Sequence, residues 1–177
     1  MQIQRTPQPD ERYMRLALEQ AQLAYDRGEI PVGAVAVHHG QVIAQAYNTK
    51  EQDRDPSAHA EMTALRQAAQ HVGGWRLLGV TLYCTMEPCP MCAGAMIQAR
   101  LPRLVYAIDD PKAGASGSVM DLLNHPRLNH QVQVTKGVLA ADASAMLARF
   151  FRDLRRGVLP RYSTAWRARK LAENAQP

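Results

Sequence analysis

The sequence predicts an α/β protein in which helices cover both faces of a central mixed sheet. Short apolar strand patterns alternate with longer helical patterns along most of the chain, and such alternation is typical of layered α/β folds. A chain of 177 residues suits one domain with a sizeable core. No stretch is apolar over the length that crosses a bilayer, so we expect no membrane-spanning segment.

The first half of the chain predicts a helix, two strands and a second helix, over 11–27, 32–37, 41–47 and 58–71. Asp10 is the expected N-cap of the first helix and Gly28 its end, since Asp and Gly favour these positions. His38-His39-Gly40 reads as the hairpin turn between the strands. A polar loop over 48–56 follows, and Ser57 is the expected cap of the second helix.

The second half predicts, in order, strand, helix, strand, strand and helix, over 80–85, 88–100, 104–108, 132–134 and 141–156. Pro88 suits the first turn of its helix, because the backbone N–H groups of that turn have no partner within the helix and proline has no N–H to leave unpaired. A small-residue loop over 112–118 precedes a short helix expected near Leu122. Residues 1–156 are the expected domain, and 157–177 form a basic, proline-punctuated tail that is only partly ordered.

Two separated motifs carry the chemistry. His59-Ala60-Glu61 and Pro88-Cys89-Pro90-Met91-Cys92 each fall at the start of a predicted helix. One imidazole and two thiolates supply three zinc ligands, and catalytic zinc sites keep a fourth position for water, which ionises near neutral pH. The two-part pattern is that of zinc nucleobase deaminases. Glu61 is placed to move protons rather than to coordinate the metal.

Two other readings use the same cysteines. A structural zinc site normally has four protein ligands, and Cys84 is the only remaining thiol. Because Cys84 lies in an apolar run that predicts a buried strand, we expect it in the core. A redox dithiol formed by Cys89 and Cys92 would explain neither His59 nor Glu61. The catalytic reading is therefore favoured.

Composition bears on the partner and the compartment. The formal net charge of +5 permits a polyanionic partner. A late basic run favours a phosphate-facing role over a merely solvated face; it comprises Arg149, Arg152, Arg155, Arg156, Arg161, Arg167, Arg169 and Lys170. With only 3 cysteines, two of them assigned to metal, no disulfide framework is expected. The N-terminus has no apolar signal region, so we expect a cytoplasmic protein.

From about Tyr13 to about Arg156 the chain resembles the bacterial tRNA-specific adenosine deaminases, within the cytidine-deaminase-like superfamily. The segments that carry the resemblance are Ile30-Pro31-Val32-Gly33-Ala34-Val35, Tyr47-Asn48, Asp55 to Glu61, Glu87 to Met96, Lys112 to Ser118 and Phe150-Phe151-Arg152. The first four segments are shared by several deaminases. The last two favour the tRNA enzymes.

The resemblance implies hydrolytic conversion of adenosine to inosine at the wobble position of a tRNA anticodon loop. It implies a three-layer α/β/α cytidine-deaminase-like fold, one Zn²⁺ per subunit, and a homodimer with active sites near the subunit interface. It assigns zinc binding to His59, Cys89 and Cys92, and the proton shuttle to Glu61.

The resemblance also assigns substrate contacts. Asn48 matches a residue that hydrogen-bonds the flipped nucleoside, and Asp110 and Lys112 match anticodon-loop contacts. Phe151 matches a stacking or packing position on the last helix. The chain departs from the family at Pro90, where other apolar residues are common, and after Gly157, where the tail has no match.

Two alternatives remain open at this stage. One is a small-molecule deaminase acting on guanine, cytosine or a nucleotide, against which the basic charge and the 112–118 loop argue. The other is a non-catalytic, zinc-bearing RNA-binding subunit. Glu61 argues against it, because an inactive subunit needs no proton shuttle. Glu87 is read as a buried hydrogen-bonding residue rather than as a second catalyst.

Overall fold

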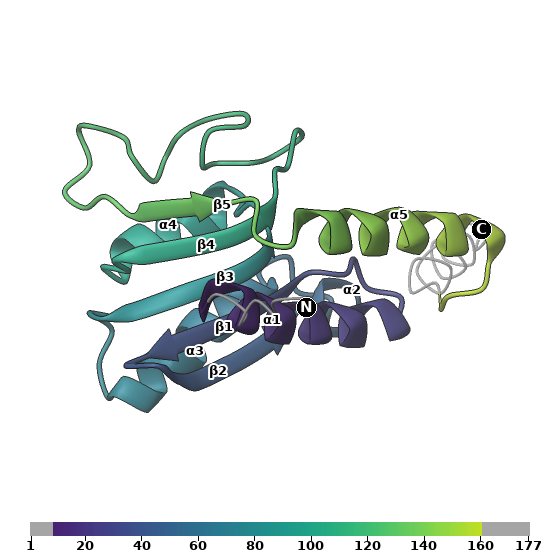
Figure 1. The fold of residues 1–177 in the computed structure, drawn as a ribbon, viewed down its shortest axis with the longest axis horizontal. Coiled ribbons are helices and arrows are strands. Elements are labelled where there is room, and N and C mark those ends of the chain that lie inside the picture. The colour runs from purple at the N-terminus through teal and green to yellow at the C-terminus, as the bar shows by residue number, and fades with distance from the viewer. Residues whose placement is uncertain (1–8, 161–177) are drawn as a thin grey trace, which may run out of the picture.

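The computed structural model describes residues 9–160 (Figure 1). The helices are α1 (Pro9–Asp26), α2 (Lys50–Asp53), α3 (Ala60–Val72), α4 (Pro90–Gln98) and α5 (Ala140–Arg156). The strands are β1 (Gly33–His38), β2 (Gln41–Tyr47), β3 (Val80–Met86), β4 (Arg103–Ile108) and β5 (Gln133–Lys136). They form one five-stranded sheet in the order β2-β1-β3-β4-β5.

Strand direction decides where a site can form. β1 is antiparallel to β2 and to β3, whereas β3, β4 and β5 are parallel to one another. β2, β3, β4 and β5 therefore run the same way and bring their carboxyl ends to one edge of the sheet. Ligands of open α/β sheets usually bind at that edge. The predicted mixed sheet is confirmed.

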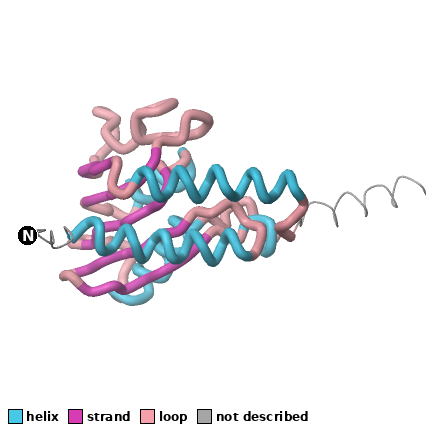
Figure 2. Tube along the Cα trace, turned by 45° about the vertical axis from the view of Figure 1, so that its right-hand side comes forward, coloured by secondary structure: helices cyan, strands magenta, loops and turns pink. Residues whose placement is uncertain are grey.

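The two faces of the sheet build two cores. In β1, Ala34 and Ala36 enter one core and Val35 and Val37 enter the other, as the two-residue period of a strand requires. The helices α3 and α4 pack on the alanine side, and α1 and α5 pack on the valine side. The predicted three-layer α/β/α arrangement is confirmed, and Figure 2 shows α1 and α5 side by side on one face.

The start of α1 is tied to the sheet by a charged residue. Asp10 was the expected N-cap, but it lies inside α1, and its carboxylate accepts bonds from Arg103 (2.8 and 2.9 Å) and from the Tyr83 hydroxyl (2.9 Å). The hydrogen bond from Arg103 is the main reason that the pKa of Asp10 is lowered. At the other end of α1, the Tyr25 hydroxyl donates to Asp153 of α5.

The starts of α3 and α4 differ from their predictions. Ser57 does not cap α3, because the helix begins at Ala60, two residues beyond the position that Ser57 would cap; the Ser57 amide and hydroxyl donate to the Asp55 carboxylate at 2.7 Å. His59 is the N-cap of α3 instead, one position before the first turn that holds Glu61. Likewise Pro90, not Pro88, fills the first turn of α4. Proline suits this position.

Two loops also differ from expectation. The predicted short helix near Leu122 is wrong, since this stretch consists of turns and an isolated bridge between Ser116 and Asp121. The Leu122 amide donates to the Ala115 carbonyl, so this loop folds back on itself rather than winding into a helix. The polar loop 48–56 contains the single turn α2.

The last described helix, α5, ends at Arg156 with Gly157 as its C-cap. Most of the predicted tail, with Arg161, Arg167, Arg169 and Lys170, lies outside the described residues. Within residues 9–160, no helix has both the length and the apolar character needed to span a bilayer.

Candidate active site

Two helix starts meet at the carboxyl edge of the sheet. Cys89 follows β3 and is the N-cap of α4, and Cys92 lies in the first turn of that helix. His59 is the N-cap of α3. Because the N-terminal end of a helix carries partial positive charge, both helices favour thiolate at this point.

The three predicted ligand atoms lie at distances that suit zinc. Nδ1 of His59 is 3.7 Å from Sγ of Cys89 and 3.6 Å from Sγ of Cys92, and the two sulfurs are 3.6 Å apart. A tetrahedral zinc ion, with bonds of about 2.3 Å to sulfur and about 2.1 Å to nitrogen, holds two sulfurs about 3.8 Å apart and each sulfur about 3.6 Å from the nitrogen. The cluster is therefore compatible with zinc.

The protonation of the sulfurs supports the same conclusion. The neighbouring Cys92 thiol is the main cause that lowers the pKa of Cys89 to about 4, with His59 acting in the same direction. The pKa of Cys92 is raised by its contact with Cys89 and by burial. The two sulfurs thus compete for one proton. A divalent cation between them would allow both to be thiolates.

Glu61 is buried beside this cluster, with 4% of its surface exposed. Burial raises its pKa above the usual carboxyl value. A carboxyl group that holds its proton more readily than one in water suits proton exchange near neutral pH. Glu61 is not one of the three clustered ligands among the described residues, as the sequence predicted.

A pocket of about 140 Å³ opens beside the cluster. Its lining consists of Ile30, Val32, Asn48, Lys50, His59, Glu61, Met86, Glu87, Cys89 and Asp110. Asn48 follows β2, Glu87 follows β3 and Asp110 comes shortly after β4, so three parallel strands deliver polar groups to one place. Ile30, Val32 and Met86 supply an apolar wall, as small-molecule sites usually have.

Asn48 is held by a residue that the sequence analysis missed. Its Nδ2 donates to Glu29 at 3.0 Å, and Glu29 also accepts the Gln52 amide at 2.7 Å. Glu29 is fully buried, and burial raises its pKa. In the sequence, an acidic residue just after a predicted helix is normally interpreted as exposed to solvent. Glu29 therefore could not be predicted as a site residue from its neighbours in the sequence.

The remaining predicted contacts divide into two groups. Asp110 lines the pocket, and its carboxylate accepts the Lys112 amide at 2.9 Å. The Lys112 side chain is exposed and does not line the pocket. Phe150 is buried, whereas Phe151 is 40% exposed on α5 and also lies outside the lining. Lys50, on α2, lines the pocket and was not predicted, because nothing in the polar loop distinguishes it.

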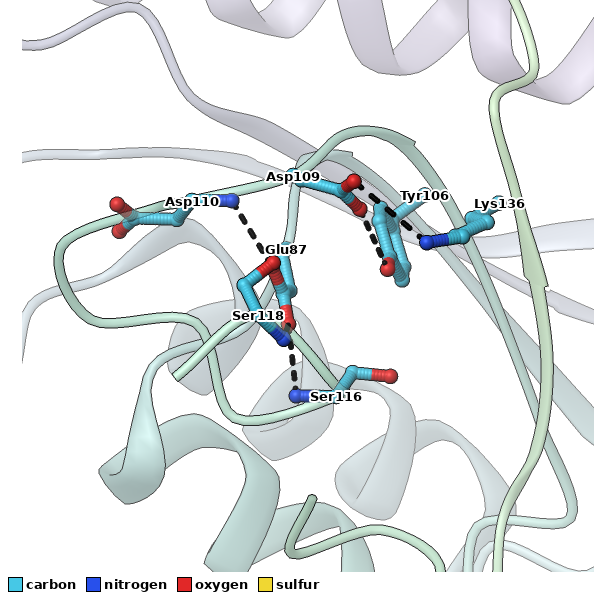
Figure 3. Close-up of polar contacts among 7 residues, drawn as sticks. All are labelled: Glu87, Tyr106, Asp109, Asp110, Ser116, Ser118 and Lys136. Carbon is cyan, nitrogen blue, oxygen red and sulfur yellow. Dashed lines mark hydrogen bonds and ion pairs between the residues drawn. The ribbon is translucent and has the colours of Figure 1, made fainter. Parts of the chain in front are cut away.

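Glu87 links the site to the loop that follows β4 (Figure 3). Its carboxylate accepts the backbone amides of Asp110 (2.9 Å), Ser116 (2.8 Å) and Ser118 (3.2 Å), and the Ser118 hydroxyl. Burial alone would raise its pKa, but these donors outweigh burial and lower it. The expectation of a buried hydrogen-bonding residue is confirmed.

Comparison with known proteins agrees with this geometry. The model of the MafB19-like deaminase family matches residues 8–155. The tRNA-specific adenosine deaminase of Bacillus subtilis is 48% identical over 147 residues, which cover 83% of this chain and 91% of that protein.

Solved structures with the same architecture include one from a study of A-to-I editing by tRNA:A34 deaminases at the wobble position. It is 40% identical, has a TM-score of 0.74, and the alignment covers 76% of this chain and 98% of the other. A guanine deaminase from Nitrosomonas europaea is 25% identical with a TM-score of 0.70, over 84% and 86% of the two chains. The family model covers most of the chain and the Bacillus subtilis relative is 48% identical over 83% of it, so the chain belongs to the MafB19-like deaminases and to the family of the tRNA-specific adenosine deaminases.

Proposed function

We propose that the protein is a zinc-dependent hydrolase that converts adenosine to inosine at the wobble position of a tRNA anticodon loop. The observation that carries the proposal is the pairing of a zinc-compatible His-Cys-Cys cluster with buried Glu61 at one pocket. A relative that is 48% identical over 147 residues is a tRNA-specific adenosine deaminase, and a solved relative belongs to the wobble-position enzymes.

His59, Cys89 and Cys92 would hold one zinc ion per chain, since their mutual distances fit a tetrahedral site. When bound, zinc would lower the pKa of a water molecule, so that a hydroxide nucleophile is available near neutral pH. Glu61 is the group that accepts the two protons of the water in turn and passes one to the ring nitrogen and the other to the departing amine. Burial raises the pKa of Glu61, which favours the protonated form that donates in the later transfers.

Recognition of the substrate divides between the pocket and its rim. The apolar wall of Ile30, Val32 and Met86 accommodates a flipped base, and Asn48 offers a fixed amide for a hydrogen bond. At the rim, Asp110 and Lys112 contact the anticodon loop. Unstacked loop bases are inexpensive to flip, which suits a pocket that accepts one base at a time.

Phe151 belongs to a second possible contact surface. Its exposed ring lies on α5, whose last turn also carries Arg155 and Arg156. An exposed aromatic ring near arginines suits stacking on a base and neutralisation of phosphates. We place this helix at the outer part of the RNA contact, away from the chemistry.

The protein acts as a homodimer through α4. Met91 is 36% exposed, and Gly94 and Ala95 are only partly covered. These residues fall on one face of the helix, at i, i+3 and i+4. A side chain built at Gly94 would meet nothing within 4 Å, which leaves room for a close approach by a second copy. Sedimentation of the wild type against Gly94→Leu tests this interface.

The compartment and the domain limits follow from the substrate and the fold. A protein that acts on tRNA with free cysteines in its site belongs in the cytoplasm, and Cys84, Cys89 and Cys92 are all unpaired. Residues 1–156 form the zinc-dependent deaminase domain, with 157–177 as a basic tail.

A second candidate is deamination of a free base. The Nitrosomonas guanine deaminase shares the fold at a TM-score of 0.70, and a pocket of about 140 Å³ suits a base on its own. The identity to the tRNA enzymes is much higher, so RNA remains the favoured substrate.

One experiment separates the two. Purified protein is incubated with an anticodon stem-loop that carries adenosine at the wobble position, and in parallel with free adenosine, cytidine and guanine. We expect inosine in the RNA. The affinity of the protein for the stem-loop should fall with salt, and a plot of log binding constant against log salt concentration should have a slope of about −0.7 per phosphate contacted. Turnover of guanine without turnover of the RNA would favour the free-base enzyme.

A further inference from the structure

Glu87 stands next to the zinc-ligand turn and borders the pocket, but its side chain is hydrogen-bonded to a loop. It precedes Pro88 and Cys89 and is 2% exposed. Its four bonds all run to the loop after β4, at Asp110, Ser116 and Ser118 (Figure 3). Because all the side-chain hydrogen bonds of this buried carboxylate go to one loop, we expect it to hold that loop in place.

The number of donors makes an ionised carboxylate the only side chain that fits. One oxygen accepts the amides of Ser116 and Ser118, and the other accepts the Asp110 amide and the Ser118 hydroxyl. A carboxylate has about four acceptor sites, whereas the amide of glutamine replaces one oxygen by a donor. In either orientation, a glutamine would set its NH₂ group against at least one backbone N–H.

Two residues of the loop, Gly114 and Ala115, allow it to lie close to Glu87 and the zinc-ligand turn. The Ala115 amide donates to the Pro88 carbonyl at 2.9 Å, which adds a backbone link to the zinc-ligand turn. A methyl group at Gly114 would overlap the Glu87 carboxylate and would lie 2.6 Å from the Asp110 carbonyl oxygen. Glycine therefore permits the close approach that lets the loop wrap the carboxylate.

We propose that Glu87 is a positioning residue that sets the loop 110–118 in register with the zinc site, so that Asp110 and Lys112 meet the RNA while the base occupies the pocket. The inference rests on the proposed RNA substrate. Although Glu87 borders the pocket, its carboxylate oxygens are taken up by the loop, so it acts through the loop and not by a bond to the substrate or the metal. It fixes the distance between the rim contacts and the reacting base through the loop.

The test compares Glu87→Gln with Gly114→Ala, which disturb the same contact from its two sides, and with the exposed control Glu19→Gln. In the stem-loop assay, both test variants should raise KM by about ten- to a hundred-fold, since a bond to a charged group is lost and the competent loop becomes a minor state. Zinc content and kcat at saturating RNA should stay near wild type, because the loss is one of binding. The control should match wild type.

Hydrogen exchange without RNA supplies an independent readout. The amides of Asp110, Ser116 and Ser118 should exchange faster in both test variants, while those of β3 and β4 should not. Unchanged exchange in the loop would overturn the positioning role whatever the activity. Loss of zinc with a fall in kcat and no change in KM would also overturn it, because Glu87 would then support the ligands.

The same assay distinguishes failure of the proposed function. If wild-type protein makes no inosine in the stem-loop, the RNA substrate is wrong and the RNA role of the loop falls with it. If the wild type is active and both variants keep its KM, the function stands and only the inference about Glu87 fails.

Discussion

Replacing Glu61 by glutamine tests the chemistry of the site most directly. The carboxylate is 4% exposed and lies beside the ligand cluster, so the substitution must keep the size of the side chain to avoid a cavity. Glutamine does so and keeps one oxygen as a hydrogen-bond acceptor. It cannot carry a proton between water and base. The variant therefore separates proton transfer from packing.

The expected loss is large. General acid–base catalysis by one side chain typically contributes about 10²- to 10⁴-fold in rate, and Glu61 is the proposed carrier for several successive transfers. We expect kcat to fall by at least about a hundredfold, with the KM for the stem-loop little changed, since Asn48 and the rim residues still bind the RNA. The other carboxylates of the pocket cannot substitute, because Glu87 is bound by four donors and Asp110 is held by the Lys112 amide.

The measurement is inosine formation under single-turnover conditions, with zinc determined on the same preparation. Glu51→Gln serves as the control, since Glu51 is an exposed glutamate on α2. A Glu61→Gln enzyme with normal zinc and a near-normal rate would refute the assigned role. Loss of zinc together with activity would show that Glu61 supports the metal site instead.

Three further outcomes follow from other contacts. Asn48→Ala should lower kcat/KM on RNA by about ten- to a hundredfold with zinc unchanged, because a substrate group loses its partner; equal activity would make Asn48 a turn residue. Cys89→Ala should lose zinc by metal analysis and lower the melting temperature, since binding energy at such sites is coupled to folding; retention of the metal would contradict the ligand set. Asp10→Asn should lower the free energy of unfolding by about 1–3 kcal/mol at neutral pH. The pKa of Asp10 is lowered in the folded protein, so the stability that Asp10 contributes is fully present above pH 3.8 and is lost as the pH falls through its folded pKa. Urea unfolding at several pH values measures the difference in unfolding free energy between wild type and Asp10→Asn. A difference that stays the same in acid would contradict this reasoning.

The sequence predicted the layers and most of the strands because their patterns are local. The alternation of Ala34, Val35, Ala36 and Val37 corresponds to the two faces of the sheet, because the alanines pack against one helix layer and the valines against the other. Helix starts were harder. Ser57 has the chemistry of an N-cap, but its hydroxyl donates to Asp55 in a local turn and His59 takes the N-cap position instead. Local preference cannot rank such competitors.

The metal ligands could be predicted for a different reason. His59, Cys89 and Cys92 belong to residue types whose chemistry is specific, and their spacing fits two helix starts. Lys50 and Glu29 carry no such signature. Lys50 reaches the pocket because α2 is a single turn inside a polar loop, and Glu29 because the chain before β1 folds under Asn48. Both placements depend on long-range packing, which no local pattern records.

The direction of the strands explains why one edge of the sheet can hold metal, proton carrier and substrate contacts together. Since β2, β3 and β4 run the same way, the chain leaves each of them at that edge, at Asn48, Glu87 and close to Asp110. The helices that return from β2 and β3 begin there too and deliver His59 and Cys89. The loop after β4 supplies no metal ligand, and its hydrogen bonds to the zinc-ligand turn run through Glu87 and the Pro88 carbonyl. A family built this way can therefore keep its chemistry while the loop adapts to a free base or to RNA, and exchange of residues 110–118 between this protein and a guanine deaminase should alter KM for RNA far more than zinc affinity.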